Sequence, residues 1–153
     1  MDDWVKDLRN KIGHQTVILP HAVTIVIDKD NNVLVEERSD DGFIDFPGGT
    51  LDLGETIEEC ATRELKEETG LIAESLELFK IYTGELTKYT YVNGDQMYGV
   101  DVVYLVRKYQ GKLTPQKEEV NKLMFVKLDD IKENLSPRNK QIIKDLKQVL
   151  WKV

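Results

Sequence analysis

This 153-residue sequence has one cysteine, no excess of basic charge and no long apolar run. The single Cys60 excludes a disulfide within the chain, and a buried structural thiol is its expected role. Acidic residues outnumber basic ones by 28 to 21, a net charge of −7 that lacks the electrostatic footprint of a protein that binds duplex nucleic acid. No apolar run approaches the roughly 18–20 residues that span a bilayer, and the charged N-terminus has no signal core. We therefore expect a soluble, cytoplasmic protein without a membrane partner.

The composition and length indicate one globular domain over residues 1–153. Hydrophobic residues make up 41% of the sequence and charged residues 32%, which is typical of a globular chain. A chain of this length buries about 70% of the surface that it exposes when unfolded. We find no internal repeat, no interdomain linker and no G-x-G-x-x-G dinucleotide-binding pattern.

Apolar periodicity and turn residues predict an α/β fold. The pattern predicts a helix over 3–12 that ends at Gly13, and a closing helix over 137–150 with Ser136 as N-cap and Pro137 as its first residue. Strands are predicted over 16–19, 22–28, 33–38, 76–84, 90–92, 97–109 and 123–128. Several strands, a central helix, more strands and a final helix favour an α/β/α sandwich around a mixed β-sheet over a doubly wound Rossmann fold.

The central helix, predicted over 56–69, carries carboxylates on the face that should be apolar. Thr56 and Glu59 form a capping box at its start, and Gly70 suits its end. At about 100° per residue the apolar arc contains Ile57, Cys60, Ala61 and Leu65. Glu64 and Glu68 project into the middle of this arc, and Glu67 lies at its edge.

The positions of these three glutamates are electrostatically unfavourable. They stand at i, i+3 and i+4, so they repel one another, and they lie in the half of the helix where the dipole disfavours negative charge. A solvated helix face is the ordinary explanation of glutamates in a helix, but it does not suit an apolar arc. A bound divalent cation with oxygen ligands would compensate the charge.

The segment that contains these glutamates resembles the Nudix box, G-x5-E-x7-R-E-U-x-E-E-x-G-U, in which U is a bulky aliphatic residue. Gly49 is followed after five residues by Glu55, and after seven more by Arg63 and the run that ends at Gly70 and Leu71. Every fixed position of the box agrees over Gly49–Leu71. The layout of the remaining chain is similar to small MutT-type Nudix hydrolases.

The resemblance implies a Nudix-type α/β/α sandwich, a loop-helix-loop that binds Mg²⁺ or Mn²⁺, and hydrolysis of a nucleoside diphosphate linked to another group. It implies metal ligands at Glu64, Glu67, Glu68 and the carbonyl of Gly48, with Arg63 as a catalytic positioning residue and Glu55 as support for the metal loop. Arg63 is one turn from Glu67 and can orient it by a charge-assisted hydrogen bond.

Further candidates lie outside the box. A further catalytic acid is expected in the loop before the late strand, with Glu119 as first candidate and Glu118 as second, against an ordinary surface loop. Relatives often have a second glutamate three residues on, where this chain has Lys122. The substrate-binding candidates are Arg38, for a phosphate, and Tyr91 and Asp95 in the tyrosine-bearing hairpin. Sheet packing for the tyrosine and turn formation for the aspartate are the alternatives. Ile44 replaces a tryptophan common in relatives.

Substrate identity is less constrained by the sequence. We expect a small nucleotide substrate, and the leading hypothesis is that the protein is a nucleoside triphosphate pyrophosphohydrolase. The alternatives are a hydrolase of nucleotide sugars or dinucleoside polyphosphates, and a non-catalytic nucleotide sensor. ADP-ribose-specific relatives carry a proline about sixteen residues beyond the box, and 71–113 contains none. A homodimer is possible by analogy with the family.

Overall fold

The computed structural model describes residues 3–115 and 120–150, except the side chains of Val120 and Asn121. Its helices are α1 (Asp3–Ile12), α2 (Ile57–Thr69) and α3 (Pro137–Leu150), with short 3₁₀ helices η1 (Gly84–Thr87) and η2 (Leu128–Asp130). Its strands are β1 (Val17–Val26), β2 (Val33–Arg38), β3 (Ile44–Asp45), β4 (Gly48–Thr50), β5 (Ile72–Ala73), β6 (Glu77–Tyr82), β7 (Tyr89–Thr90), β8 (Gln96–Val106), β9 (Tyr109–Gln110) and β10 (Val120–Val126).

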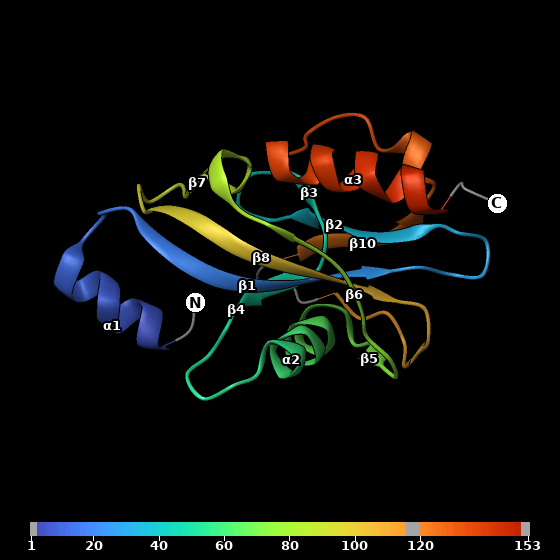
Figure 1. Ribbon diagram of the computed structural model, residues 1–153, viewed down its shortest axis with the longest axis horizontal. Helices are drawn as coiled ribbons and strands as arrows, with labels where there is room; N and C mark the ends of the chain where they lie inside the picture. Colours follow the sequence, from blue (N-terminus) through green and yellow to red (C-terminus); the bar gives the residue numbers. More distant parts are fainter. Residues whose placement is uncertain (1–2, 116–119, 151–153) are drawn as a thin grey trace.

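The main sheet lies between α2 and α3, which cover opposite faces (Figure 1). Its strand order is β4-β1-β8-β6, with β7 also paired to β8. The long β1 and β8 strands run parallel, while β4, β6 and β7 pair antiparallel with their neighbours. The predicted α/β/α sandwich around a mixed sheet is therefore confirmed.

Two features of the strands differ from the prediction. Strands β10, β2 and β3 form a second antiparallel sheet, and β5 pairs with β9 in a third. The two predicted strands 16–19 and 22–28 are one strand that continues through Pro20. This is possible because the Pro20 carbonyl accepts from the Leu51 N–H just beyond β4, so the side from which proline's N–H is missing faces past the end of that strand.

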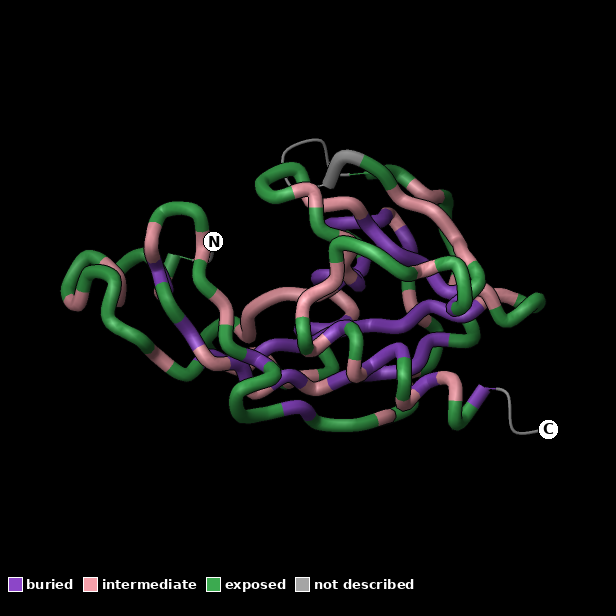
Figure 2. Tube along the Cα trace, turned by 90° about the horizontal axis from the view of Figure 1, so that it is seen from above, coloured by how far each residue is buried: buried purple, intermediate pink, exposed green. Residues whose placement is uncertain are grey.

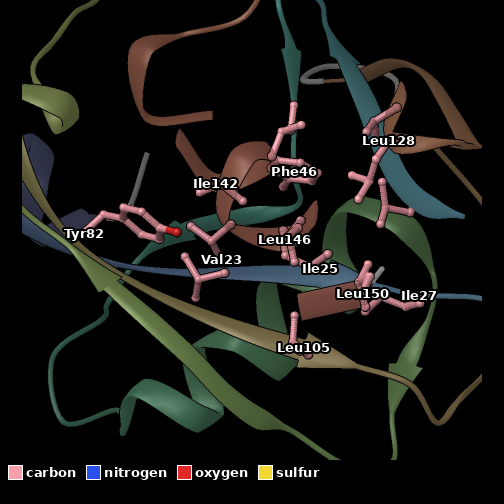
Figure 3. Close-up of a cluster of buried hydrophobic side chains, with 14 residues drawn as sticks. Val23, Ile25, Ile27, Phe46, Tyr82, Leu105, Leu128, Ile142, Leu146 and Leu150 are labelled. Carbon is pink, nitrogen blue, oxygen red and sulfur yellow. The ribbon is translucent and has the colours of Figure 1, made fainter. Parts of the chain in front are cut away.

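The largest apolar core joins α3 to the main sheet. Ile142, Leu146 and Leu150 of α3 face Val23, Ile25 and Ile27 of the β1 segment (Figure 3). Buried residues run through the middle of the molecule (Figure 2). The spacing of i and i+4 in α3 is the helix-face pattern that the sequence predicts. This core holds the sheet in place beside the region where α2 meets β4.

The N-terminal helix α1 lies apart from the two covering helices, at one end of β1 and β8 (Figure 1). Its Trp4 indole N–H donates to the carbonyl of Leu51 at 3.0 Å. Among residues 3–115 and 120–150, no helix is long and apolar enough to cross a membrane.

Candidate active site

Helix α2 presents Glu64 and Glu68 to the sheet, as the sequence predicts. Thr56 Oγ1 accepts from the Glu59 N–H at 3.1 Å, and Gly70 ends the helix at φ 80°. These caps define where the helix begins and ends, and hence which residues face the sheet. Glu64 and Glu68 are only 9% and 6% exposed, whereas the side chain of Glu67 is 52% exposed.

Two glycines of β4 allow the backbone to approach these carboxylates. The Gly48 N–H donates to Glu68 Oε2 at 2.9 Å. A Cβ at Gly49 would overlap the carboxylate of Glu64, so glycine is required there for close approach rather than for an unusual φ. The register of β4 with β1, in which Gly48 pairs with Val23, fixes the position of this backbone.

Arg63 ties the loop before α2 to the helix. Its Nε and Nη2 atoms donate to the two carboxylate oxygens of Glu55 at 2.6 and 2.9 Å. Its Nη1 atom donates to Glu64 at 2.8 Å and to Glu67 at 3.3 Å. The Arg63–Glu67 contact expected from helical spacing is present, but the bidentate pair with Glu55 is shorter. The guanidinium group lowers the pKa of Glu55 to about 2.

A buried acid from another strand joins the glutamates, and sequence reasoning missed it. Glu36 of β2 is 4% exposed and lines the same pocket as Glu64 and Glu68. Burial, followed by the charges of Glu36 and Glu64, raises the pKa of Glu68 well above its usual value. The sequence does not single out Glu36, because it is one of three consecutive charged residues that end β2, VLVEER.

The donor chemistry of this group fits a hard divalent cation. Its members are carboxylates, and Mg²⁺ and Mn²⁺ prefer oxygen ligands. A cation would also relieve the repulsion that raises the pKa of Glu68. Within the described part of the chain, no three acidic, histidine or cysteine side chains have already converged into a metal-binding group. Arg63 engages Glu64 and Glu67, and the Gly48 N–H engages Glu68.

A pocket of about 450 Å³ extends from these glutamates toward α1. Its lining includes the three predicted substrate-binding residues, Arg38, Tyr91 and Asp95. Arg38 is held by Asp40 through two hydrogen bonds, of 3.0 and 2.7 Å, and its guanidinium carbon lies 5.8 Å from the ring centre of Tyr89. It is therefore near the site but already paired.

Asp95 and Tyr91 lie in the hairpin at the α1 end of the pocket. Asp95 is 5% exposed, and its carboxylate contacts His14 Nδ1 at 2.8 Å and Asn93 Nδ2 at 3.2 Å. The Tyr91 N–H donates to the Asp95 carbonyl at 2.8 Å, as expected of a turn. The structure therefore brings both residues to the pocket and also gives Asp95 a role in shaping the hairpin.

A network of buried polar groups crosses the pocket wall, and no pattern in the sequence indicates it. His21 Nδ1 lies 3.0 Å from Asp101, which also accepts from Arg138 Nη1 at 3.0 Å. Arg138 Nη2 and Asn139 Nδ2 donate to Asp45 at 2.9 and 2.8 Å. Burial alone would raise the pKa of Asp101, but the contacts with His21 and Arg138 lower it. These contacts link α3 and β3 to β1 and β8.

The remaining candidates differ in their outcome. Glu118 and Glu119 lie outside the described residues. Cys60 is fully buried, as predicted, and burial with the charges of Glu55 and Glu64 raises its pKa to about 12. Ile44 packs against the main core and lines the pocket.

Comparison with known proteins agrees with this geometry. The sequence profile of the NUDIX domain matches residues 18–146. The chain is 43% identical over 65 residues to the ADP-ribose pyrophosphatase of Methanocaldococcus jannaschii, and the matched region covers 40% of this chain and 38% of that protein. It is 35% identical over 63 residues to the 8-oxo-dGTP diphosphatase of Escherichia coli, 39% of this chain and 49% of that protein. The matched parts thus span about half or less of these curated relatives.

The fold is shared with solved structures. A MutT NUDIX hydrolase from Burkholderia pseudomallei superposes with a TM-score of 0.71 at 21% identity, over 85% of this chain and 98% of that one. At this identity the likeness concerns the fold. The domain profile covers most of the chain, and the glutamate helix, its two glycines and the sandwich occur together. The chain belongs to the Nudix family.

Proposed function

We propose that this protein is a divalent-metal-dependent nucleoside triphosphate pyrophosphohydrolase of the MutT type. The observation that carries the proposal is that the buried Glu36, Glu64 and Glu68 line one end of the pocket, beside Gly48 and Gly49 of β4. Arg63 pairs with Glu64, but burying several carboxylates close together remains costly because they repel one another. A Mg²⁺ or Mn²⁺ ion bound by the glutamates of α2 would supply positive charge both to these carboxylates and to a phosphate group of the substrate.

The residues have separate roles in this proposal. Glu64, Glu67, Glu68 and the Gly48 carbonyl would hold the cation. When bound, it would neutralise phosphate charge and lower the pKa of the attacking water. Arg63 keeps Glu64 and Glu67 in place from the flank, while Glu55 holds Arg63. The Gly48 N–H fixes one oxygen of Glu68, which leaves its second oxygen for the cation.

The rest of the pocket would bind the nucleotide. Arg38 is the candidate phosphate contact, and a bound phosphate would compete with Asp40 for its guanidinium group. Glu119 stays our candidate for a further catalytic acid, on the sequence pattern alone. A small pocket of about 450 Å³ suits a mononucleotide rather than duplex nucleic acid.

A second candidate substrate class has its own support. The relative from M. jannaschii is named an ADP-ribose pyrophosphatase, and it is 43% identical over the region it shares with this chain. That name favours the nucleotide-sugar alternative, whereas the 8-oxo-dGTP diphosphatase of E. coli favours the triphosphate. The missing proline after the box weighs against ADP-ribose.

The experiment is a hydrolysis panel. Purified protein with Mg²⁺ or Mn²⁺ is given nucleoside triphosphates, an oxidised purine triphosphate, ADP-ribose, a nucleotide sugar and a dinucleoside polyphosphate. Products are separated so that release of pyrophosphate and of phosphate can be distinguished. We expect pyrophosphate and a nucleoside monophosphate from a triphosphate. If no substrate is cleaved with either metal, the proposed activity is wrong.

A further inference from the structure

Helix α1 lies before the part of the chain that the Nudix profile matches, yet it forms part of the pocket. The profile begins at residue 18, and α1 spans Asp3–Ile12. Val5 and Arg9 of α1 are nevertheless among the residues that line the pocket. An element that lines a binding site can alter what binds there, so the way α1 is held and the surface that it offers bear on specificity.

Several specific contacts hold α1 in place. Trp4 bonds to the Leu51 carbonyl at 3.0 Å, which ties the helix to the loop after β4. Arg9 Nη2 donates to the Gln96 carbonyl at 2.8 Å, and its Nη1 donates to that of Gly13 at 3.1 Å. Arg9 Nε also lies 3.7 Å from Asp95. These bonds fix α1 against the start of β8. The face of α1 that carries Val5 and Arg9 is therefore a preformed wall of the pocket.

The surface that α1 completes is apolar and aromatic. Val5, Leu19 and Met97 form one buried cluster, with exposed fractions of 4%, 5% and 8%. Tyr89 and Tyr91 pack against this cluster, with ring centres 4.8 Å apart in an edge-to-face arrangement. Arg9 donates to main-chain carbonyls through Nη1 and Nη2, and its Nε lies beside Asp95, so the charges of both groups are compensated within the wall. This end of the pocket therefore suits a flat, largely apolar group rather than a phosphate.

The distance along β1 matches the length of a nucleotide. Val23 of β1 pairs with Gly48 beside the glutamates, and Leu19 lies four residues away at the α1 end. Four residues of a strand span about 13 Å. Residues 19, 21 and 23 share one face of β1, and all three line the pocket. A nucleotide with its phosphates at the glutamates would therefore place its base against α1.

We propose that α1 is a substrate-recognition element, in which Val5 forms the end wall of a subsite for the nucleobase. This inference rests on the proposed nucleotide substrate, but it concerns an element outside the matched Nudix domain. The wall limits the depth of the subsite, so a change in the bulk of residue 5 alters binding of a purine more than binding of a pyrimidine.

The test measures binding, which separates it from the test of hydrolysis. Non-hydrolysable α,β-imido analogues of a purine and a pyrimidine nucleoside triphosphate are titrated calorimetrically into the full chain with Mg²⁺. Val5→Trp fills the end of the subsite, and we expect purine binding to weaken by about tenfold or more, as overpacking of a formed pocket does. Lys6→Trp is the matched control, because Lys6 is exposed on the same helix, and its affinities should stay within about twofold.

A second variant keeps the test decisive if Val5→Trp unfolds α1. Val5→Ala deepens the subsite, and we expect the purine analogue to lose about threefold to tenfold in affinity, more than the pyrimidine analogue does. Unchanged affinities in Val5→Ala, with α1 still folded, overturn the inference even if the wild-type protein hydrolyses nucleotides. Binding that responds as expected in a protein without turnover overturns the proposed hydrolysis instead. Absence of any nucleotide binding overturns both.

Discussion

At the scale of single residues, the glutamates of α2 show which site residues a sequence can reveal. Their positions within an apolar arc follow from helical geometry alone, and Glu64 and Glu68 are indeed buried. Glu36 could not be found in this way, because its proximity depends on how β2 pairs in a separate sheet. Arg38 was predicted near the phosphates, but its pairing with Asp40 was not.

Glu68→Gln should separate stability from activity. Its carboxylate is buried, and burial with the charges of Glu36 and Glu64 raises its pKa well above the usual value. Such an acid destabilises the metal-free fold at pH 7, because its charged form is favoured in the unfolded chain. We expect Gln, which can still accept from the Gly48 N–H, to raise the free energy of unfolding by about 1 kcal/mol or more.

The measurement is urea unfolding of both proteins in the presence of a chelator, together with their turnover in Mg²⁺. Turnover should fall by roughly a hundredfold or more if Glu68 binds the cation. A variant that is less stable than the wild type, or one that is equally active, would contradict the role of this carboxylate.

Gly49→Ala should act through Glu64. The added Cβ would overlap the Glu64 carboxylate, which must move away, whereas the backbone of residue 49 has no positive φ to strain. We expect turnover to fall by about tenfold or more with a small change in melting temperature. A double-mutant cycle checks the cause: in a Glu64→Gln background the alanine should have a much smaller effect. Equal effects in both backgrounds would show that the glycine acts elsewhere.

At the scale of elements, the loop-helix-loop around α2 is the part that the sequence predicts best. Local sequence patterns predict its caps, its apolar arc and the position of Arg63, because these features depend on contacts between residues close in sequence. The Glu55–Arg63 pair is only eight residues apart in the chain, yet the spacing argument pointed to Glu67 as the partner of Arg63. Glu55 lies before the helix, where helical periodicity no longer places side chains.

The Glu55–Arg63 pair predicts a pH dependence of stability. The folded pKa of Glu55, about 2, is below the value of about 4.3 expected in the unfolded chain. Its contribution to stability is therefore fully present above about pH 4.3 and is lost as the pH falls toward 2. We expect Glu55→Gln to be destabilised at pH 6–7, with the difference from the wild type shrinking over that acid window. A difference that is constant from pH 7 to pH 2 would contradict the ion pair.

The N-cap of α2 can be tested as an element on its own. Thr56→Ala removes the hydroxyl that accepts from the Glu59 N–H, and we expect a loss of about 1 kcal/mol in the free energy of unfolding. Thr56→Ser keeps the acceptor and serves as the matched control. Denaturant unfolding of the two variants should differ by that amount, and equal stabilities would show that the cap contributes nothing.

At the scale of the whole molecule, the fold follows from element order, but the site does not. The sandwich and its mixed sheet could be predicted because the strand and helix patterns are strong and their order limits the topology. The division into separate sheets, and the polar network of His21, Asp101, Arg138 and Asp45, depend on contacts between segments far apart in sequence. No local pattern encodes such contacts.

The negative charge of the molecule disfavours binding of an anionic substrate, and the proposed cation would offset this effect. The chain carries a net charge of −7, and carboxylates gather at one end of the pocket where a polyanionic substrate would have to bind. A bound cation would reduce the repulsion between these carboxylates and the phosphates of the substrate. We therefore expect binding of the phosphates to need a divalent ion at the glutamates.

The most direct measurement is an equilibrium titration with Mn²⁺, followed by electron paramagnetic resonance of the free ion, on the wild type, Glu68→Gln and Glu58→Gln. Glu58 is an exposed glutamate of the same helix and serves as the control. We predict saturable Mn²⁺ binding in the wild type and in Glu58→Gln, and affinity lower by about tenfold or more in Glu68→Gln. Equal Mn²⁺ affinity in all three proteins, or no saturable binding in the wild type, would contradict the metal site.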